Sequence, residues 1–264
     1  MSITPKVISE SIASFFGRPH PVVNRSPLQV GWWLDTTHSA FIWESPRPAR
    51  RPDVRASHGK SVLRCPAVID HESRLFEIPC PIDILLRFVD DENQPRLQHI
   101  GGEDASIRSK NLMDMISLTP RVEWRHPARP LLQVATPYRF VADEDTYLSQ
   151  LPPFLHFRQV PWPGLLVTGR MPIHLWPRRL SWAFEWHDTS RELVISRGEP
   201  WFYVRFEGNG ANRNVKLLEA DLTPALSDYC KGLDGVTGFV NHTYSLFAVA
   251  RQRRPKRLLS PKQR

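Results

Sequence analysis

The chain has little cysteine and no long apolar run. Its 264 residues include three cysteines, Cys65, Cys80 and Cys230, and none of them forms a CxxC pair. A sparse, odd count favours reduced thiols in a reducing compartment over a disulfide framework. No apolar run approaches the roughly 18 residues that a membrane span needs, and the N-terminus lacks the apolar centre of a signal peptide. We therefore expect a cytoplasmic protein that does not enter a membrane.

Several common catalytic motifs are also missing. The sequence contains no GxGxxG, GxxxxGKS/T, HExxH or GxSxG pattern. These patterns supply the phosphate loops, zinc ligands and nucleophile turns of widespread enzymes, so their absence counts against the common nucleotide-binding and hydrolase classes. No repeat recurs at a fixed period, and no change in composition divides the chain into two large domains.

Proline and aromatic residues, by contrast, are abundant. The sequence has 25 prolines, nine tryptophans and 13 phenylalanines. Proline cannot donate a ladder hydrogen bond and it breaks helix interiors, so this content favours short strands, sheet edges and loops. The large aromatic rings provide apolar area to fill the interior of a sandwich or barrel.

The strongest pattern covers residues 164–207. Large apolar residues alternate with other residues in its middle part, at Leu180, Trp182, Phe184 and Trp186. A period of two predicts a strand with one apolar face. Runs at 192–196 and 201–207, separated by polar turns, predict two further strands. We expect these three strands to form an antiparallel meander.

Similar short runs along the rest of the chain predict roughly ten or more strands with turns between them and few helices. The expected fold class is therefore all-β with minor helices, as an antiparallel jelly-roll-like or double-stranded β-helix sandwich. Loops rather than crossover helices separate the runs, which argues against a parallel α/β sheet.

A few helices are expected. Thr4-Pro5 predicts a helix start, because a capping hydroxyl precedes proline at the first helical position. An apolar stripe that includes Ile12 follows, and this helix is expected to dock on the body. Thr223-Pro224 repeats the device, and residues 241–251 can form a terminal helix.

The chain is expected to divide into a docking helix at 1–18, one β-rich domain at 19–250 and a basic tail at 251–264. Within the domain we expect a mobile loop at 45–60, a strand at 65–70 followed by a polar turn, and a helical turn within 143–151.

Several short motifs together resemble a known group of proteins. They are Cys65-Pro66-Ala67 with Asp70, Pro81-Ile82-Asp83, Arg197-Gly198-Glu199-Pro200 with Tyr203-Val204-Arg205-Phe206, Thr243-Tyr244-Ser245-Leu246-Phe247 and Arg253-Arg254-Pro255-Lys256-Arg257-Leu258-Leu259. The pattern is similar to an uncharacterised family found in tailed bacteriophages and some proteobacteria, over most of the chain from about Val62 onward. The resemblance implies a phage or bacterial cytoplasmic setting, with no activity and no catalytic residues to carry over.

One group of residues could bind a metal ion. Glu185 and His187 lie two apart on the predicted strand and project from the same face, and His174 lies on the preceding segment. Two imidazoles and a carboxylate can bind non-haem iron, as in double-stranded β-helix enzymes. Those enzymes use His-x-Asp on one strand, however, whereas His187 and Asp188 are adjacent here. The alternative is a solvated sheet face that carries ordinary polar residues.

Two further acidic clusters have simpler interpretations. Asp70-His71-Glu72 offers three consecutive ligand types, but neighbours on a strand point to opposite faces, which favours a polar turn. Asp143-Glu144-Asp145 lacks the glycine and the later glutamate of a calcium loop, so an acidic helix start explains it better.

The tryptophans permit two interpretations. Trp176 and Trp201 belong to a cluster that could form an exposed platform for sugars or bases. The alternation of residues along the predicted strands favours core packing for most of these rings.

The formal net charge of +8 comes mainly from one end of the chain. Seven cations and no acid lie in the last 14 residues, at Arg251, Arg253, Arg254, Lys256, Arg257, Lys262 and Arg264. Without them the chain carries +1, so a broad nucleic-acid platform on the body is not indicated. Cations interspersed with prolines predict a disordered arm that binds nucleic acid or an acidic protein surface. The alternative is an arm that only adds solubility.

We therefore favour a non-enzymatic binding or structural protein whose basic C-terminal arm contacts an acidic partner. One alternative is a cupin-like or non-haem iron oxygenase-like enzyme that uses His174, Glu185 and His187. Another is a carbohydrate-binding module built on the tryptophans.

Overall fold

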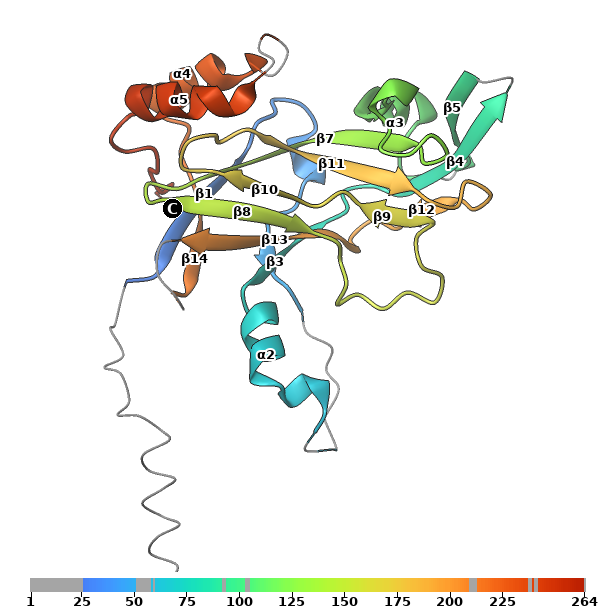
Figure 1. Ribbon diagram of the computed structural model, residues 1–264, viewed down its shortest axis with the longest axis horizontal. Coiled ribbons are helices and arrows are strands. Elements are labelled where there is room, and N and C mark those ends of the chain that lie inside the picture. The colour runs from blue at the N-terminus through green and yellow to red at the C-terminus, as the bar shows by residue number, and fades with distance from the viewer. Residues whose placement is uncertain are drawn as a thin grey trace, which may run out of the picture.

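The computed structural model describes residues 26–50, 58, 60–91, 94–102, 105–208, 213–236, 239 and 242–263. Within these residues, two large sheets pack against each other around a shared core, and a small third sheet extends one end of the molecule. The two C-terminal helices lie together at the other end (Figure 1). The helix expected at residues 1–18 falls outside the described residues.

The first sheet has six strands in the order β14, β1, β7, β11, β9, with β6 also paired to β7. The strands are β1 (Leu28–Leu34), β6 (Ile116–Leu118), β7 (Leu131–Val141), β9 (Gly164–Leu166), β11 (Arg179–Trp186) and β14 (Val215–Glu219). The pair β1–β14 is parallel, and the other pairs among the described strands are antiparallel.

The second sheet has five strands in the order β10, β8, β13, β3, β2. They are β2 (Arg47–Pro48), β3 (Leu75–Pro79), β8 (Thr146–Leu151), β10 (Gly169–Pro172) and β13 (Pro200–Gly208). The third sheet, in the order β12, β4, β5, contains β4 (Ile84–Asp91), β5 (Gln94–His99) and β12 (Leu193–Ile195).

The prediction of a mostly β fold with few helices is confirmed. The predicted meander within 164–207 is wrong, although its strands are present. β11, β12 and β13 follow one another in the chain but belong to three different sheets. Alternation shows that a strand buries one face, but it does not identify the strand that pairs with it. The jelly-roll-like or double-stranded β-helix topology stays a prediction.

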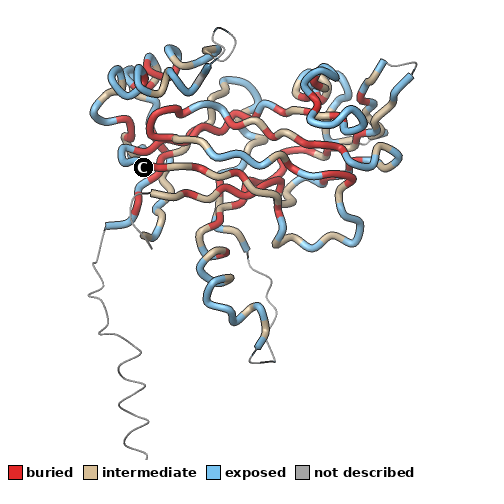
Figure 2. The backbone as a smooth tube through the Cα atoms, in the orientation of Figure 1, coloured by how far each residue is buried: buried red, intermediate tan, exposed pale blue. Residues whose placement is uncertain are grey.

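The main core lies between the two large sheets. All four alternating residues of β11 are at most 1 % exposed: Leu180, Trp182, Phe184 and Trp186. Across the interface, Trp201 of β13 is fully buried, and its ring centroid lies 5.3 Å from that of Trp182. Burial of each large apolar side chain contributes roughly 1.5–3 kcal/mol, so this cluster is a major source of stability. Figure 2 shows the buried residues running along the strands.

The helices are short. They are α2 (Pro66–Glu72), α3 (Ser109–Met115), α4 (Pro224–Leu233) and α5 (Leu246–Arg253), with 3-10 turns at Ala40–Ile42, Val62–Arg64, Arg121–Glu123 and Thr243–Ser245. No helix in the described ranges is long and apolar enough to cross a membrane. The helix expected after Thr223 is confirmed, because its hydroxyl accepts a hydrogen bond from the Leu226 amide at 3.2 Å. The terminal helix expected at 241–251 is present as α5, but it begins later and ends later, at Leu246–Arg253, after a 3-10 turn.

Three local predictions were wrong. The strand and polar turn expected at 65–72 are the helix α2, which begins with Pro66 in the first turn. The helical turn expected within 143–151 is a bend at 143–145 followed by the strand β8. Part of the loop expected at 45–60 is the strand β2, which pairs with β3.

A second, smaller core lies beneath α4 and residues 254–263, which we call the C-terminal segment. Its members are Trp33, Val141, Ala220, Leu226, Tyr229, Cys230, Leu258 and Leu259. Because neighbouring residues of a strand face opposite ways, β7 contributes Phe140 to the main core and Val141 to this one. The two cores are therefore joined through shared strands.

Candidate partner-binding surface

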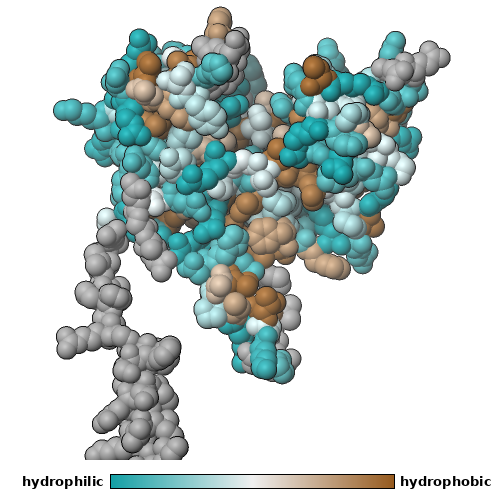
Figure 3. All heavy atoms as spheres, viewed as in Figure 1, coloured by the Kyte–Doolittle hydropathy of each residue, from teal (hydrophilic) through white to brown (hydrophobic). Residues whose placement is uncertain are grey.

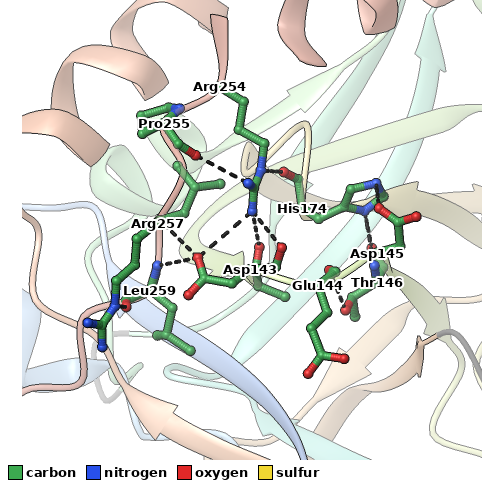
Figure 4. A network of polar contacts seen from close by, with 11 residues as sticks. Asp143, Glu144, Asp145, Thr146, His174, Arg254, Pro255, Arg257 and Leu259 are labelled. Atoms are coloured by element: carbon green, nitrogen blue, oxygen red, sulfur yellow. Dashed lines mark hydrogen bonds and ion pairs between the residues drawn. The ribbon is translucent and has the colours of Figure 1, made fainter. Parts of the chain in front are cut away.

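The C-terminal segment is attached to the body by one arginine. Arg254 follows α5, and its guanidinium Nε donates to the His174 carbonyl oxygen at 2.7 Å. Its terminal nitrogen donates to the carbonyl oxygens of Ala142 at 3.2 Å and Asp143 at 2.7 Å (Figure 4). The arginine thus joins the chain end to two separate segments of the body.

Asp143 holds the same segment from the other side. Its carboxylate accepts hydrogen bonds from the backbone amides of Leu258 at 2.6 Å and Leu259 at 3.1 Å. The two leucine side chains are 1 % and 3 % exposed. Leu259 packs against Gly31 of β1, where an added Cβ would collide with it. Farther along, the Lys262 amide donates to the Glu219 carbonyl oxygen at 2.9 Å.

The prediction of a disordered arm at 251–264 is therefore wrong for its described residues. The first three residues belong to α5, Arg254 is hydrogen-bonded to the body, and residues 258–262 pack against β1 and the end of β14. The two leucines explain the difference, because a count of charge over the whole segment does not register a buried apolar pair in its middle. Arg264 lies outside the described residues.

The predicted cations divide into two groups. Arg254 is used to hold the fold, and Lys262 forms an ion pair with Glu219 at 2.5 Å. The others are exposed and form no ion pair with any residue that the structure describes: Arg251, Arg253, Lys256 and Arg257. We call these four residues the basic surface.

The three predicted metal ligands are not brought together. His174 is 3 % exposed, with Nδ1 3.0 Å from the Thr146 amide nitrogen and Nε2 3.2 Å from Asp145 Oδ1. Both ring nitrogens therefore already have partners at the start of β8. Among the described residues, no group of three or more His, Cys, Asp and Glu side chains is placed to hold a metal ion.

Glu185 has a different environment from the one that a metal ligand needs. Its side chain is buried on β11, where it is hydrogen-bonded to Arg125 and lies 3.4 Å from Arg129 and 3.5 Å from His187. Burial alone would raise the pKa of Glu185, but the arginines outweigh it and lower the pKa below its ordinary value. Two neighbouring cations also repel a metal ion, so the proposed iron site is not supported by this geometry.

The predicted aromatic platform is not exposed. Trp201 is fully buried, and Trp176 is 4 % exposed with its ring 5.3 Å from that of Phe247 on α5. The stacking of sugars or bases requires exposed ring faces, so these two residues are core rather than platform.

One cation near the basic surface was not identified from the sequence. Arg178 is exposed, forms no ion pair within the described part of the chain, and lines a cavity of about 370 Å³ together with Trp176 and Leu233. Its neighbour Arg179 differs, because it pairs with Asp35 at 2.8 Å. The sequence Pro-Arg-Arg-Leu does not reveal which of the two arginines is paired.

Comparison with family models, with curated proteins and with solved structures finds no match. The resemblance to proteins of tailed bacteriophages and the cytoplasmic setting therefore stay predictions.

Proposed function

We propose that this protein is a non-enzymatic binding protein that presents an ordered basic surface to an acidic partner. The observation that carries the proposal is the attachment of the C-terminal segment by Arg254, Asp143 and the two buried leucines. This attachment holds the cations of the basic surface in place before any partner arrives. A surface that is already ordered loses less conformational entropy on binding than a disordered arm does.

The distribution of charge also supports the proposal. The chain outside its last 14 residues carries only +1, so the positive charge is concentrated at one end. A local cluster of exposed cations steers an acidic partner toward that end and raises its association rate.

The proposal can be tested by retention on heparin, used as a polyanionic probe. The triple variant Arg251→Ala/Arg253→Ala/Lys256→Ala should elute at a clearly lower salt concentration than the wild-type protein, because three counter-ion contacts are lost. Deletion of 251–264 is a poor test, since it also removes Arg254 and the buried leucines.

A matched control has the same net charge as this triple variant but loses three cations from other parts of the surface. Lys110, Arg197 and Lys216 are exposed and form no ion pair within the described residues. Their triple alanine variant should elute close to the wild-type position. An equal loss of retention in both variants would show that only net charge matters and would contradict the proposal.

A further inference from the structure

An apolar groove lies between α4 and α5, next to the basic surface. Its volume is about 470 Å³, within the range of natural ligand pockets. Figure 3 shows hydrophobic residues among hydrophilic ones over these two helices. Trp176 of the body lines the groove between them.

The walls of the groove are one face of each helix. The residues from α4 are Ala225, Asp228, Tyr229, Gly232 and Leu233, and those from α5 are Leu246, Val249, Ala250 and Arg253. Both sets follow the spacing i, i+3, i+4, i+7, which places their members on one side of a helix. The groove is therefore a trough between two helices.

Positive charge borders this trough. Arg253 lines the groove itself, and Arg178 lines the adjoining cavity, which shares Trp176 and Leu233 with it. Neither arginine has an ion-pair partner among the described residues. Of the nearby acids, Asp234 is hydrogen-bonded to Arg139, and Asp228, which also lines the groove, lies 3.7 Å from Lys231.

We propose that the groove binds an amphipathic helix of an acidic protein. A row of apolar side chains on that helix fills the trough, while its carboxylates meet Arg253 and Arg178. This inference rests on the proposed function and specifies the acidic partner. Helix-in-groove recognition combines such an apolar row with charges beside it.

The lining argues against nucleic acid as the occupant. Bases bind single-strand grooves by stacking on exposed aromatic rings. Here most wall residues are aliphatic, and the ring of Trp176 is 4 % exposed. A leucine or phenylalanine side chain fits this lining better than a base does.

Gly232 permits a direct test. Gly232 lines the groove, and a Cβ added there would meet no heavy atom within 4 Å apart from its chain neighbours and the backbone of its own helix, so the position has room for a larger side chain. Gly232→Phe should fill the trough, and Gly232→Ala is the matched control. Both variants of the full chain should keep the wild-type circular dichroism.

The probe is a fluorescein-labelled peptide of about 14 residues, or four helical turns, with leucines at i, i+3, i+4 and i+7 and glutamates on the other face. Fluorescence anisotropy should show binding to the wild-type chain and to Gly232→Ala. Gly232→Phe should weaken the affinity by roughly tenfold or more. A peptide of the same composition in scrambled order should bind at least roughly tenfold more weakly.

The outcomes separate this inference from the proposed function. Equal peptide affinity in Gly232→Phe and the wild-type chain, with heparin retention still dependent on the basic surface, would overturn the groove alone. Tighter binding of a DNA oligonucleotide than of the peptide would also overturn it. Binding of the peptide to the Ile12→Asp variant but not to the wild-type chain would show that the chain's own first residues compete for the groove. That result would contradict the proposal.

Discussion

The carboxylate of Glu185 shows how an acidic side chain can be buried when arginines lie beside it. It sits on the face of β11 opposite the tryptophans, where alternation predicts exposure, yet it is 3 % exposed. Arg125 and Arg129, which lie 60 and 56 positions earlier, cover it and supply its hydrogen bonds. At Glu185 both faces of β11 are therefore covered, one by aromatic rings and the other by ion pairs.

The lowered pKa of Glu185 gives its contribution to stability a defined dependence on pH. A carboxyl whose pKa is lower in the folded chain stabilises fully above its unfolded pKa, near the ordinary 4.5, and this contribution is lost as pH falls through the folded pKa. Glu185→Gln should therefore lower the free energy of unfolding by about 1–2 kcal/mol at pH 7.

Urea unfolding of both proteins at a series of pH values measures the effect. The difference between wild type and Glu185→Gln should shrink as the pH falls below 4.5. A difference that stays constant through the acid range would mean that the ionised carboxylate is not what stabilises this site.

The C-terminal segment is an element of the fold as well as a carrier of charge. Some of its side chains contact the body and others face solvent. Arg254 and Leu258 contact the body, whereas Lys256 and the preceding Arg253 are exposed. The attachment of the basic surface therefore depends on the packing of residues inside the same segment.

Removal of one buried side chain tests that attachment. Leu258 is 1 % exposed, so Leu258→Ala should lower the free energy of unfolding by about 2–4 kcal/mol through lost burial and a cavity. Leu222 is 51 % exposed and serves as the control, because Leu222→Ala removes the same atoms. Leu222→Ala should change the free energy of unfolding by less than about 0.5 kcal/mol. Denaturant unfolding that finds the two variants equally stable would contradict the docked position of the segment.

The whole molecule combines three sheets and two cores that share strands. β1 and β7 contribute residues to the main core and also to the smaller core beneath α4. Separation of the two cores would require these strands to split along their length, which breaks ladder hydrogen bonds on both sides. We therefore expect one cooperative unfolding transition.

The cysteines report on each part of this transition. Cys65 is exposed, Cys80 belongs to the main core and Cys230 to the smaller one. Burial raises the pKa of Cys80 to about 12 and that of Cys230 to about 11, which keeps both as unreactive thiols. Iodoacetamide should modify Cys65 in the native protein. It should modify Cys80 and Cys230 only on unfolding, with the same denaturant midpoint for both thiols. Mass spectrometry would reveal a separate unit if Cys230 were modified at a lower midpoint than Cys80.

Features that depend on near neighbours in the chain could be read from the sequence. Alternation identified β11 as a strand with buried tryptophans, and Thr223-Pro224 identified the start of α4. Each rests on the geometry of a few consecutive residues, which is the same in any fold.

Features that depend on distant residues could not be read in this way. Strand partners, the arginines over Glu185 and the separation of His174 from it all join positions far apart in the chain. The groove likewise requires α4 and α5 to meet over Trp176. Local patterns state which side chains need burial or a partner, but the path of the backbone decides which distant residues satisfy that need.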